Sequence, residues 1–308
     1  MKNELFDLSN CYCCPRECGA DRFSEKKGFC NSPAGFSIGS ICIHRGEEPP
    51  ISGNYGICNI FFTRCNLQCI FCQNYQISSN KHLEIEYNLQ LNDVINLIND
   101  GIDKGADAVG FVSPSHFIPQ MKQIISEIKD NGKKPIIVMN TNAYDKQTTI
   151  NDLEDYIDIY LPDFKYSDNR LALRYSKARN YTTTALDAIA EMYRQKGSNL
   201  FLNENGYAEN GLIVRHLVLP GEVENSINCL RLLADRIGTS VHLSLMSQYN
   251  PPDNRLKFAN LNRKLFADEY ELVVSEAERL GFYKGWFQEM DSATSYNPNF
   301  REVHPFAI

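Results

Sequence analysis

From residue 57 onward, short apolar runs alternate with longer stretches in which apolar residues recur every three or four positions. The run "AVGFVS" at 108–113 is typical of a buried strand, because it is short, continuous and bounded by polar residues. The stretch before it has one apolar face at helical spacing, formed by Leu91, Val94, Ile95, Ile98 and Ile102. The alternation therefore predicts strand–helix units in series.

Six such units predict an α/β fold in which a parallel sheet curls into a partial, open TIM-type barrel. Active sites of such barrels are built at the carboxyl-terminal edge of the strands, so we expect chemistry there. One of the helices is expected to enter at Pro119, since proline suits a first helical turn. The expected strands are 57–64, 108–113, 135–140, 157–164, 212–220 and 241–246.

The segment 11–55 is rich in Cys, Gly and Pro and has no sustained helical or alternating pattern. We expect a loop-rich unit that a metal orders, ending in the turn-filled connector "GEEPPISGNYG". The predicted division is a Cys-rich metal-binding extension at 1–55 and the partial barrel at 56–308. The polar piece "NENGYAENG" at 203–211 is expected to be a surface loop.

The composition is that of an ordinary soluble protein, with 43% hydrophobic residues, 22% charged residues and a formal net charge of -7. A negative surface disfavours binding to nucleic acids and to anionic membranes. No apolar run is long enough to span a bilayer, and the start "MKNELFDLSN" lacks the apolar region of a signal peptide. We expect a cytoplasmic protein with neither nucleic-acid nor membrane partners.

Ten of the 11 cysteines are clustered in two groups, six between Cys11 and Cys42 and four between Cys58 and Cys72, and Cys229 is alone. This clustering indicates metal ligation rather than a disulfide framework. In the first group, Cys11, Cys14, Cys18 and Cys30 have the spacing C-x2-C-x3-C-x11-C, and Cys13 is an extra candidate. Four such ligands fit either a second iron–sulfur cluster or a closed zinc site, with unliganded thiols as the third interpretation.

The second group, in "TRCNLQCIFCQN", has three cysteines at C-x3-C-x2-C spacing, namely Cys65, Cys69 and Cys72. Four thiolates fill a [4Fe–4S] cluster, so three leave one iron open for an exogenous chelate. The alternatives are a chance grouping or a zinc site with a distant fourth ligand. The position of the motif, directly after the first expected strand, favours the open cluster.

The motif resembles that of the radical S-adenosylmethionine (SAM) superfamily, in which SAM occupies the open iron, and Phe71 is the aromatic residue common before the last cysteine. The resemblance extends through "CCPRECGADR", "GEEPPISG", "VSPSH", "DIYLPDFKY" and "RHLVLPG" to nearly the whole chain. These segments are similar to those of the PflX-like group, which is related to the pyruvate formate-lyase activating enzyme.

The resemblance also implies a SAM site. "NTNAY" resembles the "DTNG" of the activating enzymes, "DFK" their "DLK" and "RHLVLPG" their "RYVVVPG". Their Gly-Gly-Glu segment is replaced by "FVSPSHF", so that a serine or His116 would have to substitute; a monovalent-cation site is doubtful because Asn140 replaces an aspartate. The residues so nominated are Ser113, Ser115, Asn140, Asn142, Asp163, Lys165, Arg215 and Gln248.

The resemblance implies a radical SAM oxidoreductase that makes a 5′-deoxyadenosyl radical and abstracts a hydrogen atom from an unidentified protein, peptide or small molecule. A reductant such as flavodoxin or ferredoxin would supply the electron. The more specific alternative is a glycyl-radical enzyme activase. Alternatives from other classes are a non-enzymatic electron-transfer protein with two clusters and a zinc-binding interaction module.

Overall fold

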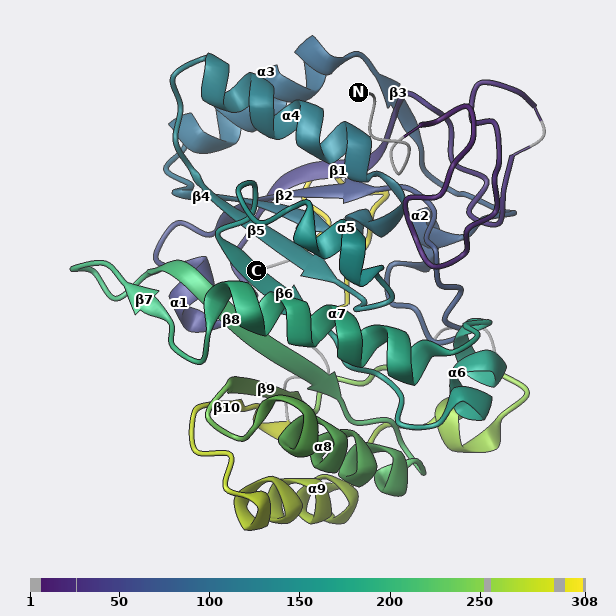
Figure 1. The fold of residues 1–308 in the computed structure, drawn as a ribbon, viewed down its shortest axis with the longest axis vertical. Coiled ribbons are helices and arrows are strands. Elements are labelled where there is room, and N and C mark those ends of the chain that lie inside the picture. Colours follow the sequence, from purple (N-terminus) through teal and green to yellow (C-terminus); the bar gives the residue numbers. More distant parts are fainter. Residues whose placement is uncertain (1–6, 26, 252–255, 291–296, 307–308) are drawn as a thin grey trace.

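A computed structural model describes residues 7–25, 27–251, 256–290 and 297–306. Its main feature is a curled sheet in which seven strands run parallel, in the order β2-β4-β5-β6-β8-β9-β10 (Figure 1). The sheet is not closed, because its two edge strands do not pair. The α/β partial barrel expected from the sequence is therefore confirmed. The parallel strands are β2 (Ile57–Phe62), β4 (Ala108–Val112), β5 (Ile136–Thr141), β6 (Ile159–Pro162), β8 (Ala208–Leu217), β9 (His242–Met246) and β10 (Gly285–Phe287).

The sequence pattern did not predict β10, which is the seventh parallel strand. It also did not predict three strands that extend this sheet by antiparallel pairing. β1 (Phe36–His44) pairs with β2, β3 (Tyr87–Leu89) pairs with β1, and β7 (Phe201–Leu202) pairs with β8. The expectation of an irregular segment up to residue 55 was wrong for 36–44. The prediction of a surface loop at 203–211 was wrong for 208–211, because these residues begin β8. The division of the chain at residue 55 stays a prediction.

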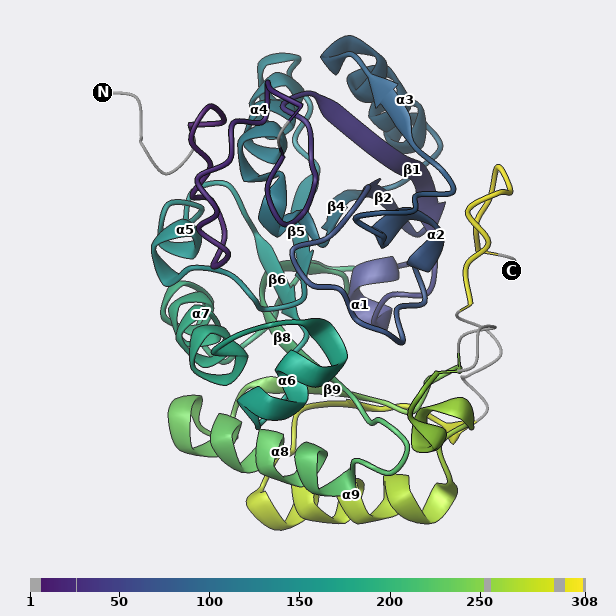
Figure 2. The ribbon, with the colours of Figure 1, turned by 90° about the vertical axis from the view of Figure 1, so that its right-hand side faces the viewer.

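Helices cover the outer face of the sheet, with α4, α5, α7 and α8 along one side in Figure 2. The two short helices α1 and α2 flank β2 in the chain, and β2 leads directly into the cysteine motif. The helices are α1 (Pro49–Ser52), α2 (Tyr75–Ser78), α3 (Leu91–Asp103), α4 (Ile118–Asp130), α5 (Gln147–Asn151), α6 (Asn169–Ser176), α7 (Tyr181–Lys196), α8 (Val223–Ile237) and α9 (Ala267–Leu280).

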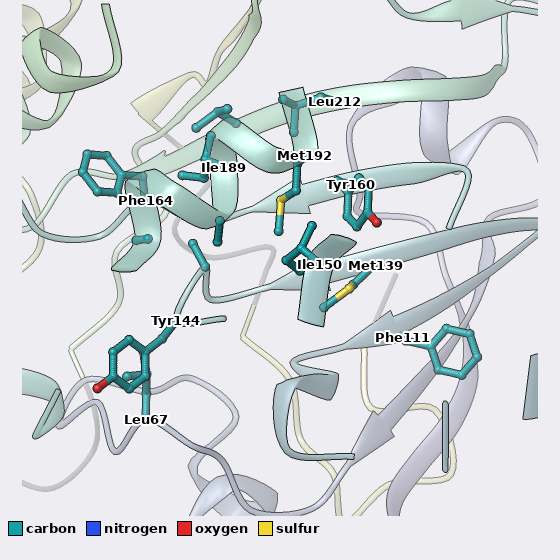
Figure 3. Packing of buried hydrophobic residues seen from close by; sticks show 14 of the residues in the cluster. Leu67, Phe111, Met139, Tyr144, Ile150, Tyr160, Phe164, Ile189, Met192 and Leu212 are labelled. Carbon is teal, nitrogen blue, oxygen red and sulfur yellow. The ribbon is translucent and has the colours of Figure 1, made fainter. Parts of the chain in front are cut away.

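The main hydrophobic core lies between the outer face of the sheet and these helices (Figure 3). Phe111 of β4, Met139 of β5 and Tyr160 of β6 belong to it, and none of them is exposed to solvent. Leu67 from the cysteine motif also belongs to this cluster. Burial of side chains of this size stabilises the fold by about 1.5–3 kcal/mol each, and it fixes the loop that carries Leu67.

The inner face of the curled sheet is apolar at one level and polar at the next. Ile57, Val138 and Ile213 form a small apolar cluster together with Ile51 of α1. Because side chains two residues apart lie on the same face of a strand, the next inward residues are Asn59, Asn140 and Arg215. The interior of the barrel thus has an apolar floor at the amino-terminal ends and a polar layer above it.

Gly110 of β4 makes room for this polar layer. A Cβ atom on Gly110 would lie 2.0 Å from Oδ1 of Asn59, which is far below any allowed contact. A larger residue in β4 would therefore displace the Asn59 carboxamide.

His216 joins β8 to two other elements by hydrogen bonds at both ring nitrogens. Nδ1 lies 2.6 Å from the carbonyl oxygen of Phe164, and Nε2 lies 2.8 Å from Oγ of Ser226 in α8. A neutral ring satisfies both, since Nδ1–H donates to the carbonyl and Nε2 accepts from the hydroxyl. Burial lowers the pKa of His216 to about 4.

We expect this histidine to make stability depend on pH. Its pKa is depressed in the folded chain, so its contribution is complete above the ordinary value of 6.5 and is lost as the pH falls towards about 4. In that window, His216→Gln should reduce the slope of unfolding free energy against pH by about 1.4 kcal/mol per pH unit. Urea unfolding at several pH values measures both slopes, and equal slopes would contradict the expectation.

Candidate active site

The cysteine loop, which we define as residues 63–72, begins where β2 ends, at the carboxyl-terminal edge of the sheet. Its three cysteines are all partly exposed. The side chain of Asn80 fixes the start of the loop. Its Oδ1 accepts a hydrogen bond from the Cys65 N–H at 3.1 Å, and its Nδ2 donates to the Cys65 carbonyl oxygen at 3.0 Å.

Every sulfur atom of the loop accepts a hydrogen bond from a neighbouring group. Donors of this kind stabilise thiolate charge and tune iron–sulfur clusters. The donors are the Leu67 N–H at 3.3 Å and Asn142 Nδ2 at 3.5 Å to Cys65, Ser176 Oγ at 2.9 Å to Cys69, and Ser78 Oγ at 3.2 Å to Cys72.

Two thiols of the loop, those of Cys65 and Cys69, are costly to ionise without a ligand. Burial raises the pKa of Cys65 well above its usual range, and burial raises the pKa of Cys69 to about 11, although the charge of Lys165 opposes the second shift. Iron binds the thiolate form and releases the proton. Three thiols with sulfur-directed donors and a nearby cation therefore fit a [4Fe–4S] cluster.

In the part of the chain that the structure describes, no three His, Cys, Asp or Glu side chains are placed so that one metal ion could contact them all. A four-iron cluster binds each thiolate through a different iron, so its ligands do not need a common ion position.

A network of buried charges crosses the barrel interior below the cysteine loop. Asp163, just after β6, accepts hydrogen bonds from Lys165 Nζ at 2.6 Å and from Arg215 Nε at 2.7 Å. Arg215 also donates to Glu47 Oε2 at 3.0 Å and to Asn140 Oδ1 at 2.6 Å. Burial alone would raise the pKa of Asp163, but the two cations outweigh it and lower that pKa.

The two cations of the network, Arg215 and Lys165, have different roles. Arg215 uses Nε, Nη1 and Nη2 within the network, so it braces the interior. The Lys165 side chain donates to Asp163, and its positive charge opposes the rise in the pKa values of the Cys65 and Cys69 thiols. Lys165 is therefore the cation of this pair that faces the cysteine loop.

The serines and asparagines at the ends of β4 and β5 also have different partners. Asn142 contacts the cysteine loop, since its Nδ2 donates to Asn66 Oδ1 at 2.8 Å as well as to the Cys65 sulfur. Asn140 faces the charge network instead. Ser113 has a left-handed backbone with φ of 50°, and the Ser115 hydroxyl lies 3.3 Å from that of Thr141. All four lie at the carboxyl-terminal edge, as the sequence indicated.

Phe71 and Gln248 lie at the rim of the site. Phe71 packs against Tyr175 and Tyr249, with ring centroids 6.5 and 6.1 Å apart. The Gln248 carbonyl oxygen accepts a hydrogen bond from Gln73 Nε2 at 3.1 Å. A cavity of about 250 Å³, lined in part by Phe71, Cys72 and Asn250, opens beside the loop.

The amino-terminal cysteines come together in a loop-rich segment before β1. Cys11, Cys13, Cys14 and Cys30 are buried, and Cys18 is exposed. The sulfur atoms of Cys11 and Cys13 are 3.5 Å apart. Cys13 thus lies inside the group, although the spacing alone had nominated the other four.

Arg22 lies against this group and is only 3% exposed. It donates to the His116 carbonyl oxygen, to Cys11 Sγ at 3.1 Å and to Cys13 Sγ at 3.4 Å. Within the described ranges no carboxylate pairs with it. Burial alone would lower its pKa, but the neighbouring cysteines raise it overall. A buried, permanent cation of this kind favours thiolates, which are the form that binds metals.

Comparison with known families agrees with this geometry. The family model described as the Radical SAM superfamily matches residues 59–233, which is more than half of the chain. This chain belongs to the radical SAM superfamily. The match contains the cysteine loop, the β4 and β5 ends and the Asp163–Arg215 pair, whereas the amino-terminal cysteines, Glu47 and Gln248 lie outside it.

Individual relatives are distant. The chain is 28% identical over 297 residues to "Uncharacterized protein MJ0674" of Methanocaldococcus jannaschii, covering 91% of this chain and 80% of that protein. Among solved structures it is similar in fold to SuiB of Streptococcus suis bound to the precursor peptide SuiA, with a TM-score of 0.50 and 13% identity. That match covers 77% of this chain and 50% of SuiB, so the chain spans about half the length of SuiB.

A second similar structure is HydG, a maturase of the [FeFe]-hydrogenase, with a TM-score of 0.48 and 15% identity. It covers 73% of this chain and 49% of HydG. At 13% identity the similarity to SuiB concerns the fold alone.

Two glutamates of the "GEEPPISG" segment, Glu47 and Glu48, also lie in the interior of this radical SAM barrel, and neither was predicted as a site residue. Besides binding Arg215, Glu47 accepts hydrogen bonds from Asn59 at 3.1 Å and Asn140 at 3.3 Å. Glu48 is 9% exposed, and its Oε2 has no hydrogen-bond partner among the described residues. Burial raises the pKa of Glu48. The only signal in the sequence was a pair of acidic residues in the connector that precedes the first expected strand.

The search for membrane-spanning helices in the described ranges found none with the necessary length and apolar character.

We expect Asp163→Asn to reduce the free energy of unfolding at pH 7 by about 3–5 kcal/mol, because it leaves two buried cations without their shared partner. Because the pKa of Asp163 is lowered in the folded chain, its stabilising contribution is complete above the ordinary pKa of 3.8. That contribution is lost as the pH falls through the lowered pKa. Urea unfolding of both proteins from pH 7 to pH 3 measures this.

The matched control is Asp155→Asn, which changes an exposed carboxylate on the outer face. It should change the unfolding free energy by less than about 0.5 kcal/mol. Equal effects of the two substitutions would show that the buried network does not stabilise the chain.

Proposed function

We propose that this chain is a radical SAM enzyme whose Cys65, Cys69 and Cys72 hold a [4Fe–4S] cluster with one open iron. When bound, the reduced cluster supplies one electron to SAM, which yields methionine and the 5′-deoxyadenosyl radical that takes a hydrogen atom from a substrate. The arrangement that supports this proposal is the set of three thiols, each with its own hydrogen-bond donor, at the carboxyl-terminal edge of the barrel.

The side chains around the loop would bind and orient SAM. Lys165, held by Asp163 and directed towards the loop, is the point charge for the SAM carboxylate. Among the polar candidates, Asn142 hydrogen-bonds to the cysteine loop itself. Ser113 and Ser115 follow the end of β4. Phe71 and Gln248 would exclude water at the rim. Asn140 and Arg215 would act indirectly, by bracing Asp163.

The decisive experiment is anaerobic reconstitution with iron and sulfide, followed by reduction in the presence of SAM. The wild type should form 5′-deoxyadenosine. The triple variant C65A/C69A/C72A should lose about four irons per chain and form none, because a four-iron cluster needs these thiolates. Product detection by chromatography and an iron assay give the two readouts.

Cys229→Ala is the control, since Cys229 is buried in the hydrophobic core on α8 and does not belong to either group of cysteines. It should retain the iron and the product. A fully loaded wild type that forms no 5′-deoxyadenosine would overturn the proposal and would favour a non-enzymatic electron-transfer protein with two clusters.

Lys165→Met tests the SAM site separately from the cluster. Loss of one charge-assisted hydrogen bond costs about 1.5–3 kcal/mol, so the SAM dissociation constant should rise by roughly 10- to 100-fold. The iron content should not change. Equilibrium dialysis of SAM against the oxidised, loaded protein measures the affinity, and an unchanged affinity would exclude Lys165 from SAM binding.

The amino-terminal cysteines are proposed to hold a second cluster or zinc, drawn from Cys11, Cys13, Cys14, Cys18 and Cys30. The buried guanidinium of Arg22 supports a thiolate site there. About four irons remaining in C65A/C69A/C72A would indicate a cluster, because four thiolates hold four irons, whereas zinc alone would indicate a structural site. A one-electron donor such as flavodoxin or ferredoxin is the proposed reductant.

The more specific candidate is a glycyl-radical enzyme activase, which the similarity to the PflX-like group favours. Its substrate would be a glycine Cα–H in a partner protein. A stable glycyl radical, detected by electron paramagnetic resonance after mixing with a partner, would support it. Deuterium transfer to 5′-deoxyadenosine from a small molecule or peptide would instead assign another substrate.

A further inference from the structure

Arg16 lies between the two groups of cysteines and contacts the surroundings of both. It belongs to the amino-terminal segment, between Cys14 and Cys18 in the chain. Its Nε donates to the carbonyl oxygen of Asn66, the residue after Cys65, at 2.8 Å. Its guanidinium lies 3.6 Å from the ring centroid of Phe29, the residue before Cys30.

A second contact joins the same two groups. The Asn80 side chain that binds Cys65 also donates from Nδ2 to the carbonyl oxygen of Phe29 at 2.9 Å. The residue before Cys30 is therefore tied to Cys65 through one carboxamide. The cysteine loop and the amino-terminal cysteines are parts of one packed unit, so a charge placed between them acts on both.

The charge of Arg16 is not neutralised by any carboxylate in the described ranges. Its other hydrogen bond, from Nη1, goes to the carbonyl oxygen of Lys177 at 2.6 Å, and its Nη2 is buried without a partner. A buried donor without an acceptor costs about 1–3 kcal/mol. Because its neighbours include neutral carbonyls and rings, the residues that the structure describes give this permanent cation no carboxylate counter-ion.

Apart from the phenol of Tyr144, whose ring centroid lies 5.2 Å from the guanidinium, the neighbouring groups that could carry negative charge are thiols from both cysteine groups. Cys14, Cys30 and Cys65 all interact electrostatically with Arg16. Thiolates and cluster sulfides are anionic hydrogen-bond acceptors, which is what Nη2 lacks. A cation beside an iron–sulfur cluster stabilises its reduced form, since reduction adds negative charge, and so raises its reduction potential.

We propose that Arg16 is a counter-ion shared by the two cysteine sites, which raises the reduction potential of the cluster bound by Cys65, Cys69 and Cys72. This inference rests on the proposed function, because it requires that cluster. Arg16 acts as a positioning and charge-compensating residue, and it does not contact the reacting atoms. The one-electron reductant would still supply the electron. The charge of Arg16 would change only the potential at which the cluster accepts that electron.

The test is a potentiometric titration of the full chain, reconstituted anaerobically and followed by electron paramagnetic resonance. The cluster signal that changes on addition of SAM identifies the open-iron site. Arg16→Gln should shift its midpoint to a more negative potential. At the wild-type midpoint the ratio of reduced to oxidised cluster should fall about tenfold, which corresponds to 59 mV for one electron.

Two variants separate charge from packing. Arg16→Lys keeps the charge, so its shift should be less than half of that of Arg16→Gln. Arg236→Gln is the control, because Arg236 is half-exposed in α8 and pairs with Asp187 at 2.9 Å; its midpoint should equal that of the wild type. Equal shifts in R16K and R16Q, or no shift in R16Q, would overturn the inference.

Iron content separates failure of this inference from failure of the proposed function. A wild type that binds no iron contradicts both, whereas a loaded wild type with an unchanged midpoint in R16Q contradicts the inference alone. If R16Q itself does not load, Phe29→Leu replaces it, since loss of the ring releases the guanidinium without removing its charge. A smaller negative shift supports the inference, and an unchanged midpoint in that variant overturns it.

Discussion

The buried ion pair between Asp163 and Arg215 is the interaction on which the interior of the barrel depends. An arginine inside a curled sheet is tolerated only if its donors are satisfied, and here a carboxylate, a second carboxylate and a carboxamide from three segments satisfy them. The pair therefore fixes β6 against β8 and draws in Glu47 from the connector before β2. Asp163 also holds Lys165, whose charge acts on the thiols of the cysteine loop.

Around this pair the barrel is layered. An apolar floor lies at the amino-terminal ends of the strands, where Ile51 of α1 packs against inward-facing residues. The charged layer comes next, and the cysteine loop lies at the carboxyl-terminal edge. This layering shields the charged layer from water at the amino-terminal ends of the strands. It leaves the carboxyl-terminal edge as the place for chemistry. The connector that the sequence presented as a turn-filled linker thus contributes to the interior.

The amino-terminal cysteine segment is joined to the site more closely than its separate position in the sequence suggests. Arg22 ties it to His116 after β4, and Asn80 ties Phe29 to Cys65. Arg16 adds a cation between the two cysteine groups. Electrostatic interaction falls with distance and rises in poorly solvated surroundings, so this packing gives the two groups a common electrostatic environment.

The sequence by itself determined the strand–helix alternation, the order of six parallel strands and the position of the three-cysteine loop. Each of these follows from local periodicity or spacing, as in the apolar face of α3 and the C-x3-C-x2-C motif. β1 and β3 could not be predicted in this way, because antiparallel pairing with a neighbour, and not a distinct pattern, makes them strands. Only the tertiary structure decided that Glu47 binds Arg215, 168 residues away, and that Arg16 lies beside Cys65. Contacts between charged groups so distant in the chain leave no local pattern, since the folding of the sheet alone brings them together.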